Sequence, residues 1–375
     1  HGLALFFPGP GSATGEDCGE FHVHGSPAVV KGLTAALASL DGFRLAEPGE
    51  FSRRAFLNGR MDLTAVESLS DLIAAETDQQ RRLALSGVSG RLRDVCLGWR
   101  FELQTLRAKV EAELDFSDQD DVGPELNDSL REQMRSLIGR IEAVAARFRE
   151  AEIVREGFRV AIIGAANAGK SSLLNALAMR DVAIVSEEPG TTRDLVEVAL
   201  EIDGYKVIVT DTAGIREGAG IAETMGIERA RSAAELADLV ILLEDMSNPQ
   251  PVDLNVKHEV IRVGSKSDVR AGNAGRYDIV VSSLSGYGIA DLLTAIGARL
   301  RERLPVGEGL ISVRERHVGH ILRARDALRR ACEAVEMEIA AEELRFAAVE
   351  IGRVVGIGDT EDLLGEIFSR FCIGK

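Results

Sequence analysis

Cysteine, long apolar runs and net positive charge are all scarce in this sequence. The four cysteines are far apart and form no C-x-x-C pair, which argues against a disulfide framework or a structural zinc site and favours a reducing, cytoplasmic setting. No run of about 18 apolar residues occurs, so we expect no transmembrane span and no membrane partner. A net charge of −16 excludes a uniformly basic nucleic-acid surface, although it leaves room for a local basic patch.

The apolar content is sufficient for more than one domain. The chain has 375 residues, of which 45% are hydrophobic, and this length predicts two or three domains. It begins with His1 and enters a strand-like stretch at once, so we expect the native N-terminus to lie upstream.

A phosphate-binding loop stands near the middle of the chain. Residues 164–171 read Gly-Ala-Ala-Asn-Ala-Gly-Lys-Ser, a complete G-x-x-x-x-G-K-[ST] pattern. A strand-like run precedes it at 158–163 and a helix-like run follows at 172–177, which is the setting that this loop requires. We expect the backbone of the loop to hold phosphates, Lys170 to reach the β and γ phosphates, and Ser171 to bind Mg²⁺.

Further elements of a GTPase follow in the expected order. Asp211-Thr212-Ala213-Gly214 comes after an apolar strand, where the carboxylate of Asp211 would hold Mg²⁺ and the Gly214 N–H would meet a γ-phosphate. The stretch 190–194 contains Thr191 and Thr192, and the hydroxyl of Thr192 is the one that we expect to complete the Mg²⁺ shell.

A guanine-reading loop is predicted at 265–268. It reads Ser-Lys-Ser-Asp, where the N/T-K-x-D pattern usually begins with Asn, so we expect a lowered guanine affinity. Asp268 would accept the two guanine donors that adenine lacks, and Lys266 would stack on the base. Ser282 and Ser283 fit the last base-contacting loop. The alternative is an ATPase with a degenerate loop.

The sequence lacks the usual water-orienting glutamine. Ile215 follows Asp-Thr-Ala-Gly and cannot polarise water. Glu223 is the best nearby carboxylate, although spacing alone favours an ordinary solvent-exposed helix residue. Asn167 suggests another device, in which its amide oxygen holds a monovalent cation between the β and γ phosphates, where an arginine would otherwise act.

Helical patterns flank this α/β region on both sides. Apolar residues repeat every three to four positions over 92–114 and 130–148, and the chain is helical again after Pro305. Between them we predict strands at 158–163, 195–202, 205–210, 238–243, 258–263 and 278–282, with the second and third forming a hairpin. These strands predict a parallel, doubly wound sheet with one antiparallel edge, inserted into a helical domain.

Several motifs resemble those of the tRNA-modification GTPase family MnmE, also called TrmE. They are Thr14-Gly15-Glu16-Asp17, Pro48-Gly49-Glu50-Phe51-Ser52, Arg54-Ala55-Phe56-Leu57-Asn58, Asn167-Ala168-Gly169-Lys170-Ser171-Ser172, Gly190-Thr191-Thr192-Arg193-Asp194, Gly226-Ile227-Glu228-Arg229-Ala230 and the terminal Phe371-Cys372-Ile373-Gly374-Lys375. The resemblance covers essentially the whole chain.

The resemblance implies a multidomain fold. A partial α+β folate-binding and dimerisation domain would occupy 1–60, a P-loop GTPase domain 157–304, and an all-α helical domain the two segments 61–156 and 305–375. It also implies that Asn167 binds K⁺, that Glu223 orients the attacking water, and that GTP hydrolysis is stimulated by K⁺.

The resemblance further implies partners and a reaction. With the FAD-bearing protein MnmG (GidA), in a heterotetramer built on a homodimer of this chain, the family adds an aminomethyl or carboxymethylaminomethyl group to the wobble uridine of certain tRNAs. The one-carbon unit comes from a tetrahydrofolate derivative. Glu16 and Arg60 are candidates for contacts to folate, and Cys372 for a part in the modification chemistry.

Three departures from the family accompany this reading. Roughly the first 60 residues of the family's N-terminal domain are expected to be lacking, which would leave the folate site incomplete. Ser265 replaces Asn. The connection 244–258 is too short for a full crossover helix, so we expect a trimmed flank of the GTPase domain. A GTP-switched ribosome-assembly factor remains the alternative function, although no basic RNA-binding module is evident.

Overall fold

The computed structural model describes residues 1–115, 126–180, 182–184, 196–211, 234–250, 259–269, 274–304, 309–358 and 367. The chain divides into two compact units. The first comprises 1–74, 84–148 and 311–375, and the second comprises 75–83 and 149–310. No helix among the described residues is long and apolar enough to cross a membrane.

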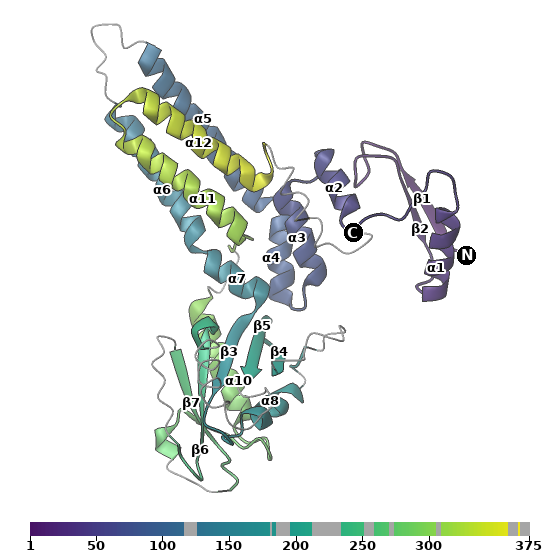
Figure 1. The fold of residues 1–375 in the computed structure, drawn as a ribbon, viewed down its shortest axis with the longest axis vertical. Helices are drawn as coiled ribbons and strands as arrows, with labels where there is room; N and C mark the ends of the chain where they lie inside the picture. The colour runs from purple at the N-terminus through teal and green to yellow at the C-terminus, as the bar shows by residue number, and fades with distance from the viewer. Residues whose placement is uncertain are drawn as a thin grey trace, which may run out of the picture. The chain divides into compact units, whose positions relative to one another are not determined.

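Four long antiparallel helices dominate the first unit: α5 (Arg91–Asp115), α6 (Asp128–Ala146), α11 (Glu315–Glu333) and α12 (Met337–Val355). Figure 1 shows α12 lying along α5 and α11, with α6 beside α11. The apolar stripes predicted over 92–114 and 130–148 form their shared core, with Leu103, Met134 and Leu344 fully buried. The chain enters α6 at Asn127, whose side chain accepts the Leu130 N–H at 2.9 Å as a helix cap.

Shorter elements complete the first unit. They are β1 (Leu3–Phe7), β2 (Cys18–His22), α1 (Pro27–Ala38), α2 (Glu50–Leu57), α3 (Leu63–Ala74) and the last part, 84–88, of α4 (Asp78–Val88). Strands β1 and β2 pair antiparallel, with Leu3 opposite His22. Helix α2 packs on α3 through a small cluster in which Leu63 and Val66 are buried and Phe56, Met61 and Ile367 pack against them.

The second unit is built on a six-stranded sheet in the order β4-β5-β3-β6-β7-β8. The strands are β3 (Phe158–Ile163), β4 (Val196–Ile202), β5 (Tyr205–Asp211), β6 (Leu239–Asp245), β7 (Glu259–Ser265) and β8 (Ile279–Val280). Only β4 pairs antiparallel, at the edge, which confirms the predicted topology. Buried central strands of a parallel sheet read as continuous apolar runs, as 158–163 does.

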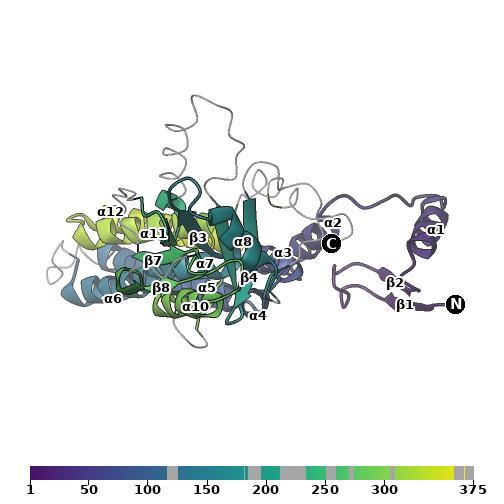
Figure 2. The same cartoon turned by 90° about the horizontal axis from the view of Figure 1, so that it is seen from below.

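Helices α7 (Phe148–Glu156), α8 (Lys170–Ala178) and α10 (Ile289–Arg303) contribute to the core on one face of this sheet. Leucines of α8 and apolar residues of α10 form one core with β3, and α7 leads into that strand. Ala161, Ile163 and Val240 face the other side, against Ala234 and Ala237. A short 3-10 helix, η1 (Ala274–Arg276), precedes β8. Figure 2 shows the same cartoon as Figure 1, seen from below.

The connection between β6 and β7 bears on one prediction. Residues 246–250 form turns and irregular structure, without a helix, while 251–258 lie outside the described residues. The expectation of a trimmed flank therefore falls mainly on residues outside the described ranges and stays a prediction.

Candidate nucleotide site

The phosphate loop links β3 to α8 as predicted. A Cβ on Gly164 would lie 2.2 Å from the Leu243 carbonyl oxygen, so only glycine fits there. Gly169 has φ +94° and forms the N-cap of α8, and Asn167 has φ +62°. These left-handed residues turn the backbone so that the loop arrives at the helix N-terminus, where free N–H groups favour an anion.

Lys170 lies against the loop that precedes it. Its Nζ donates to the carbonyl oxygens of Gly164 and Ala165, each at 2.9 Å. Burial lowers the pKa of Lys170, while the charge of Asp211 acts to raise it. The ammonium group is thus held at the helix N-terminus, within the same charged cluster as Asp211.

Ser171 and Asp211 come together from different elements. The Ser171 hydroxyl donates to Asp211 Oδ2 at 2.6 Å, and Asp211 is fully buried at the end of β5. A hydroxyl beside a buried carboxylate provides hard oxygen ligands, which suits Mg²⁺. The two side chains predicted to hold the metal are therefore adjacent, as that role requires.

The predicted base-reading residues also cluster. Asp268 Oδ1 accepts from the buried Ser282 hydroxyl at 2.5 Å, and the Ser267 N–H donates to the Val281 carbonyl at 3.3 Å. Asp268 is exposed, its Oδ2 has no hydrogen bond among the described residues, and Ser283 is next to its partner Ser282.

Two contacts at this loop were missed from the sequence. Ser265 is buried, and its hydroxyl donates to the Ala168 carbonyl of the phosphate loop at 2.6 Å. Lys266, with φ +58°, places Nζ 2.7 Å from Asp245 Oδ2. Although burial acts to raise it, hydrogen bonds from Lys266 and Ser247 hold the pKa of Asp245 at about 2. Asp245 follows an apolar strand as Asp211 does, and that position was the available signal.

Other predicted residues divide into two groups. Ala168 is buried, and Asn167 and Ser172 are exposed beside the loop. Thr191, Thr192, Gly214, Glu223 and Cys372 lie outside the described residues.

The candidate folate residues lie in the first unit. Glu16 accepts from Arg54 Nη1 and from Asn58 Nδ2, each at 3.0 Å. A Cβ on Gly15 would lie 3.2 Å from Arg60 Cγ, so the side chain of Arg60 passes close to the same loop. Glu16 and Arg60 therefore both lie near the Gly15 turn, as Asn58 does.

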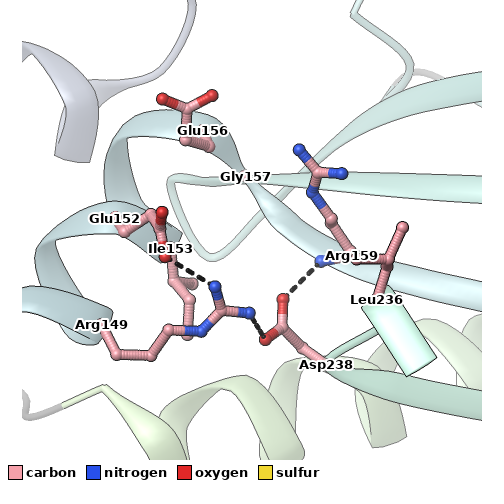
Figure 3. A pocket seen from close by; sticks show the side chains of 8 residues that line it. All are labelled: Arg149, Glu152, Ile153, Glu156, Gly157, Arg159, Leu236 and Asp238. Carbon is pink, nitrogen blue, oxygen red and sulfur yellow. Dashed lines mark hydrogen bonds and ion pairs between the residues drawn. The ribbon is translucent and has the colours of Figure 1, made fainter. Parts of the chain in front are cut away.

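A separate cavity of about 370 Å³ lies at the other end of β3 (Figure 3). Asp238 dominates it, because this buried carboxylate accepts from Arg149 Nη2 at 2.5 Å and from the Arg159 N–H at 2.9 Å. Gly157 directly precedes β3 and Arg159 is its second residue, whereas the phosphate loop follows its last residue. The cavity is therefore distinct from the nucleotide site.

A phosphate loop, an adjacent serine–aspartate pair and a second loop at 265–268, all at the carboxyl edge of this sheet, define a P-loop GTPase domain. The family profile described as "MnmE helical domain" matches residues 63–372, and that described as "GTP-binding protein TrmE N-terminus" matches residues 1–60. The chain belongs to the MnmE family.

Curated relatives agree over the full chain. A protein of Mesorhizobium japonicum named tRNA modification GTPase MnmE is 51% identical, covering 100% of this chain and 86% of the relative. One of the same name from a Chelativorans species is 49% identical, covering 100% and 85%. Among solved structures, Aquifex aeolicus Era bound to GDP·AlF4⁻ is 26% identical over 45% of this chain and 66% of that one, with a TM-score of 0.30.

The match at 1–60 corrects one expectation. We expected roughly the first 60 residues of the family's N-terminal domain to be lacking. Residues 1–60 of this chain, however, match the family's N-terminal profile. The N-terminal motifs at 14–17 and 48–58 are therefore part of that domain.

Proposed function

We propose that this chain hydrolyses GTP at the 164–171 loop and couples hydrolysis to modification of the wobble uridine in certain tRNAs. Full-length similarity to relatives named tRNA modification GTPases supports a tRNA-modifying GTPase over a ribosome-assembly factor. The observation that carries the proposal is the Ser171–Asp211 contact at 2.6 Å, since it brings both metal-binding side chains beside Lys170.

The residues act by position and charge. Lys170 would leave the loop carbonyls to donate to the β and γ phosphates. Ser171, Asp211 and Thr192 would ligate Mg²⁺, which neutralises charge on the phosphates. Gly214 would donate its N–H to the γ-phosphate, and Thr191 and Ser172 would contact the nucleotide. Lys266, Asp268, Ser282 and Ser283 would hold the guanine.

Catalysis itself is assigned to two residues. Asn167 would hold K⁺ against the β and γ phosphates, where positive charge stabilises the transition state. Its exposed position in the phosphate loop, with a left-handed backbone, supports a role directed at a ligand rather than at the core. Glu223 would orient the attacking water, since Ile215 cannot.

The modification chemistry is assigned to the first unit. Glu16 and Arg60 would contact a tetrahydrofolate derivative that donates one carbon, within the 1–60 folate-binding segment. Ile367 packs against the cluster of Leu63 and Val66, as Phe56 and Met61 do. Cys372 lies outside the described residues, and its part in the chemistry is proposed from the family resemblance of the tail 371–375.

The remaining parts of the proposal concern assembly and location. We propose a homodimer that joins the FAD-bearing MnmG in a heterotetramer, acts on tRNA and works in the cytoplasm. The domain limits at 60/61, 156/157 and 304/305 belong to the same proposal.

The test combines hydrolysis and modification. The purified chain should hydrolyse GTP, but not ATP, in Mg²⁺ and KCl, and should lose activity in EDTA. With MnmG, methylenetetrahydrofolate and unmodified tRNA, nucleoside mass spectrometry should detect the modified wobble uridine. Equal turnover of ATP, or GTP turnover without any uridine product, would contradict the proposal.

A further inference from the structure

Helix α4 begins with a reciprocal cap. Its N-cap residue Thr77 and its third residue Gln80 form a capping box, in which Gln80 Oε1 accepts the Thr77 N–H at 3.1 Å and Thr77 Oγ1 accepts the Gln80 N–H at 3.5 Å. Gln80 Oε1 also accepts the Glu76 N–H at 2.9 Å. Both residues are buried, with 5% and 8% of their surface exposed, so this turn is held in one geometry.

The same cap is tied to the start of β3. Gln80 Nε2 donates to the Arg155 carbonyl at 2.9 Å, in the last turn of α7. Three residues later the chain enters β3, which ends directly before the phosphate loop. A movement at the amino end of β3 therefore reaches the first turn of α4.

The cap is also tied to the turn between β4 and β5. Asp203 and Gly204 have φ +54° and +81°, the left-handed pair of a tight hairpin turn. The Gln79 N–H donates to the Gly204 carbonyl at 3.2 Å, and Lys206 Nζ forms an ion pair with Glu76. This turn opens β5, and β5 ends at Asp211.

The two tethered strands are those that carry the nucleotide-binding groups. β3 and β5 are parallel neighbours, with Phe158 opposite Val207 and Ile162 opposite Asp211. Their carboxyl ends lead to the phosphate loop and to the Asp211 carboxylate. Their amino ends are both fastened to residues 76–80. A shift of β5 along β3 at the end that carries Asp211 would therefore also displace the turn at residues 76–80.

We propose that residues 76–80 form a joint through which the nucleotide state at Asp211 is transmitted into α4. This inference rests on the proposed function. Residues 75–83 belong to the second unit and 84–88 to the first, so α4 continues from one unit into the other. Because α4 is one continuous helix, a displacement of its first turn, which is bonded to the sheet, should also move residues 84–88.

The Glu76–Lys206 pair is the adjustable part of the joint. Its side chains keep 32% and 22% of their surface exposed, and a pair at that exposure adds little to stability. Breaking the pair should therefore leave the domain folded while loosening the link. Within the part of the chain that the structure describes, Lys206 and Glu76 form no hydrogen bond or ion pair with a proposed GTP-binding residue, so basal hydrolysis should survive.

The test uses hydrogen exchange of the amides of residues 81–88 in the full chain. Adding Mg²⁺ with a non-hydrolysable GTP analogue should change the exchange of this segment in the wild type. Lys206→Glu should abolish that change, and the Glu76→Lys/Lys206→Glu swap should restore it. Arg82→Ala is the matched control, because exposed Arg82 pairs with Asp78 in the same turn and not with the hairpin.

Kinetics give a second readout. GTP turnover by Lys206→Glu should stay within about twofold of wild type, while uridine modification falls by about tenfold, a usual size for coupling between sites. The joint is refuted if hydrogen exchange in 81–88 does not change with the nucleotide, or if the Glu76→Lys/Lys206→Glu swap fails to restore that change. If melting temperature, turnover and modification all fall together in Lys206→Glu, the contact is merely structural. Failure of the wild type to modify tRNA would refute the proposed function, while the exchange result would still decide the joint.

Discussion

The hydroxyl of Ser265 lies 2.6 Å from the carbonyl oxygen of Ala168, so the base-reading loop is bonded to the phosphate loop. The Glu244 carbonyl lies 3.2 Å from the same hydroxyl, which has only one hydrogen to donate. Ser265 is directed at the protein rather than at a base. We therefore expect Ser265 to contribute to nucleotide binding by positioning the two loops relative to each other.

Replacing Ser265 by alanine should weaken binding of GDP and GTP alike. The Ala168 carbonyl would lose its partner in a buried setting, and an unsatisfied buried acceptor costs about 1–3 kcal/mol. Titration calorimetry with Mg²⁺·GDP measures the change. Ser267→Ala is the control, since the Ser267 hydroxyl has no hydrogen-bond partner within the described ranges. Unchanged affinity in Ser265→Ala would show that the two loops are held together by other contacts.

Asp268 should carry the choice of base. One of its carboxylate oxygens is occupied by Ser282, and the other remains to accept from guanine, whose donors adenine lacks. Asp268→Asn places an N–H₂ group where guanine also donates, so preference should move towards xanthine, which has a carbonyl there. Competition of labelled GDP against GDP, ADP and XDP tests this. If ADP competes as well as GDP with the wild type, the loop 265–268 does not read guanine.

The strands and the phosphate loop could be predicted because their signals are local. The apolar run 158–163, the Gly-rich turn and Lys170 specify each other within a few residues. Ser265 and Asp245 could not be predicted in this way, because Ala168 and Lys266, the groups they bind, are brought to them by sheet pairing across 97 and 21 positions. The cap at Thr77 and Gln80 has a local pattern, yet its bond to Arg155 is again a product of tertiary packing.

His317 should make the helical unit sensitive to mild acid. It is fully buried; its Nδ1 accepts the Arg314 N–H at 3.0 Å and its Nε2 donates to Glu67 at 2.6 Å, so the neutral ring satisfies both partners. Burial lowers the pKa of His317, against the charge of Glu67, and the charges of Arg316 and Arg314 lower it further. Stability is thus complete above pH 6.5 and falls as the pH drops from there towards the folded pKa, by up to about 1.4 kcal/mol per pH unit.

Melting curves of the full chain between pH 8 and pH 5 check this. His317→Gln keeps a donor for Glu67 without a titrating ring and should flatten the decline. His320, whose pKa burial also lowers, contributes in the same window, so His317→Gln/His320→Gln should be flatter still. Burial acts to raise the pKa of Glu67, but pairing with His317 and Arg316 outweighs it and lowers that pKa. The loss of stability from protonating Glu67 therefore occurs below pH 4.5, outside the pH range in which His317 acts. An equal slope in wild type and His317→Gln would contradict the assignment.

Glu223 should act on water and not on nucleotide binding. Glu223→Ala should lower kcat strongly while GTP affinity stays within a few-fold, because the lost interaction is made only in the transition state. Single-turnover hydrolysis and calorimetric titration separate the two effects. Normal hydrolysis by the variant would mean that another group positions the water.

K⁺ should replace the arginine that many GTPases bring to the γ-phosphate. Asn167 supplies an amide oxygen in the phosphate loop, and Ile215 offers nothing in the position of the usual glutamine. A cation held on developing transition-state charge contributes several kcal/mol, so turnover should be markedly faster in KCl than in NaCl at equal ionic strength. Asn167→Ala should lose that difference while keeping Mg²⁺·GDP binding. Ser172→Ala, changed at a neighbouring exposed position, should retain the K⁺ response. Equal wild-type rates in the two salts would exclude the cation from the mechanism.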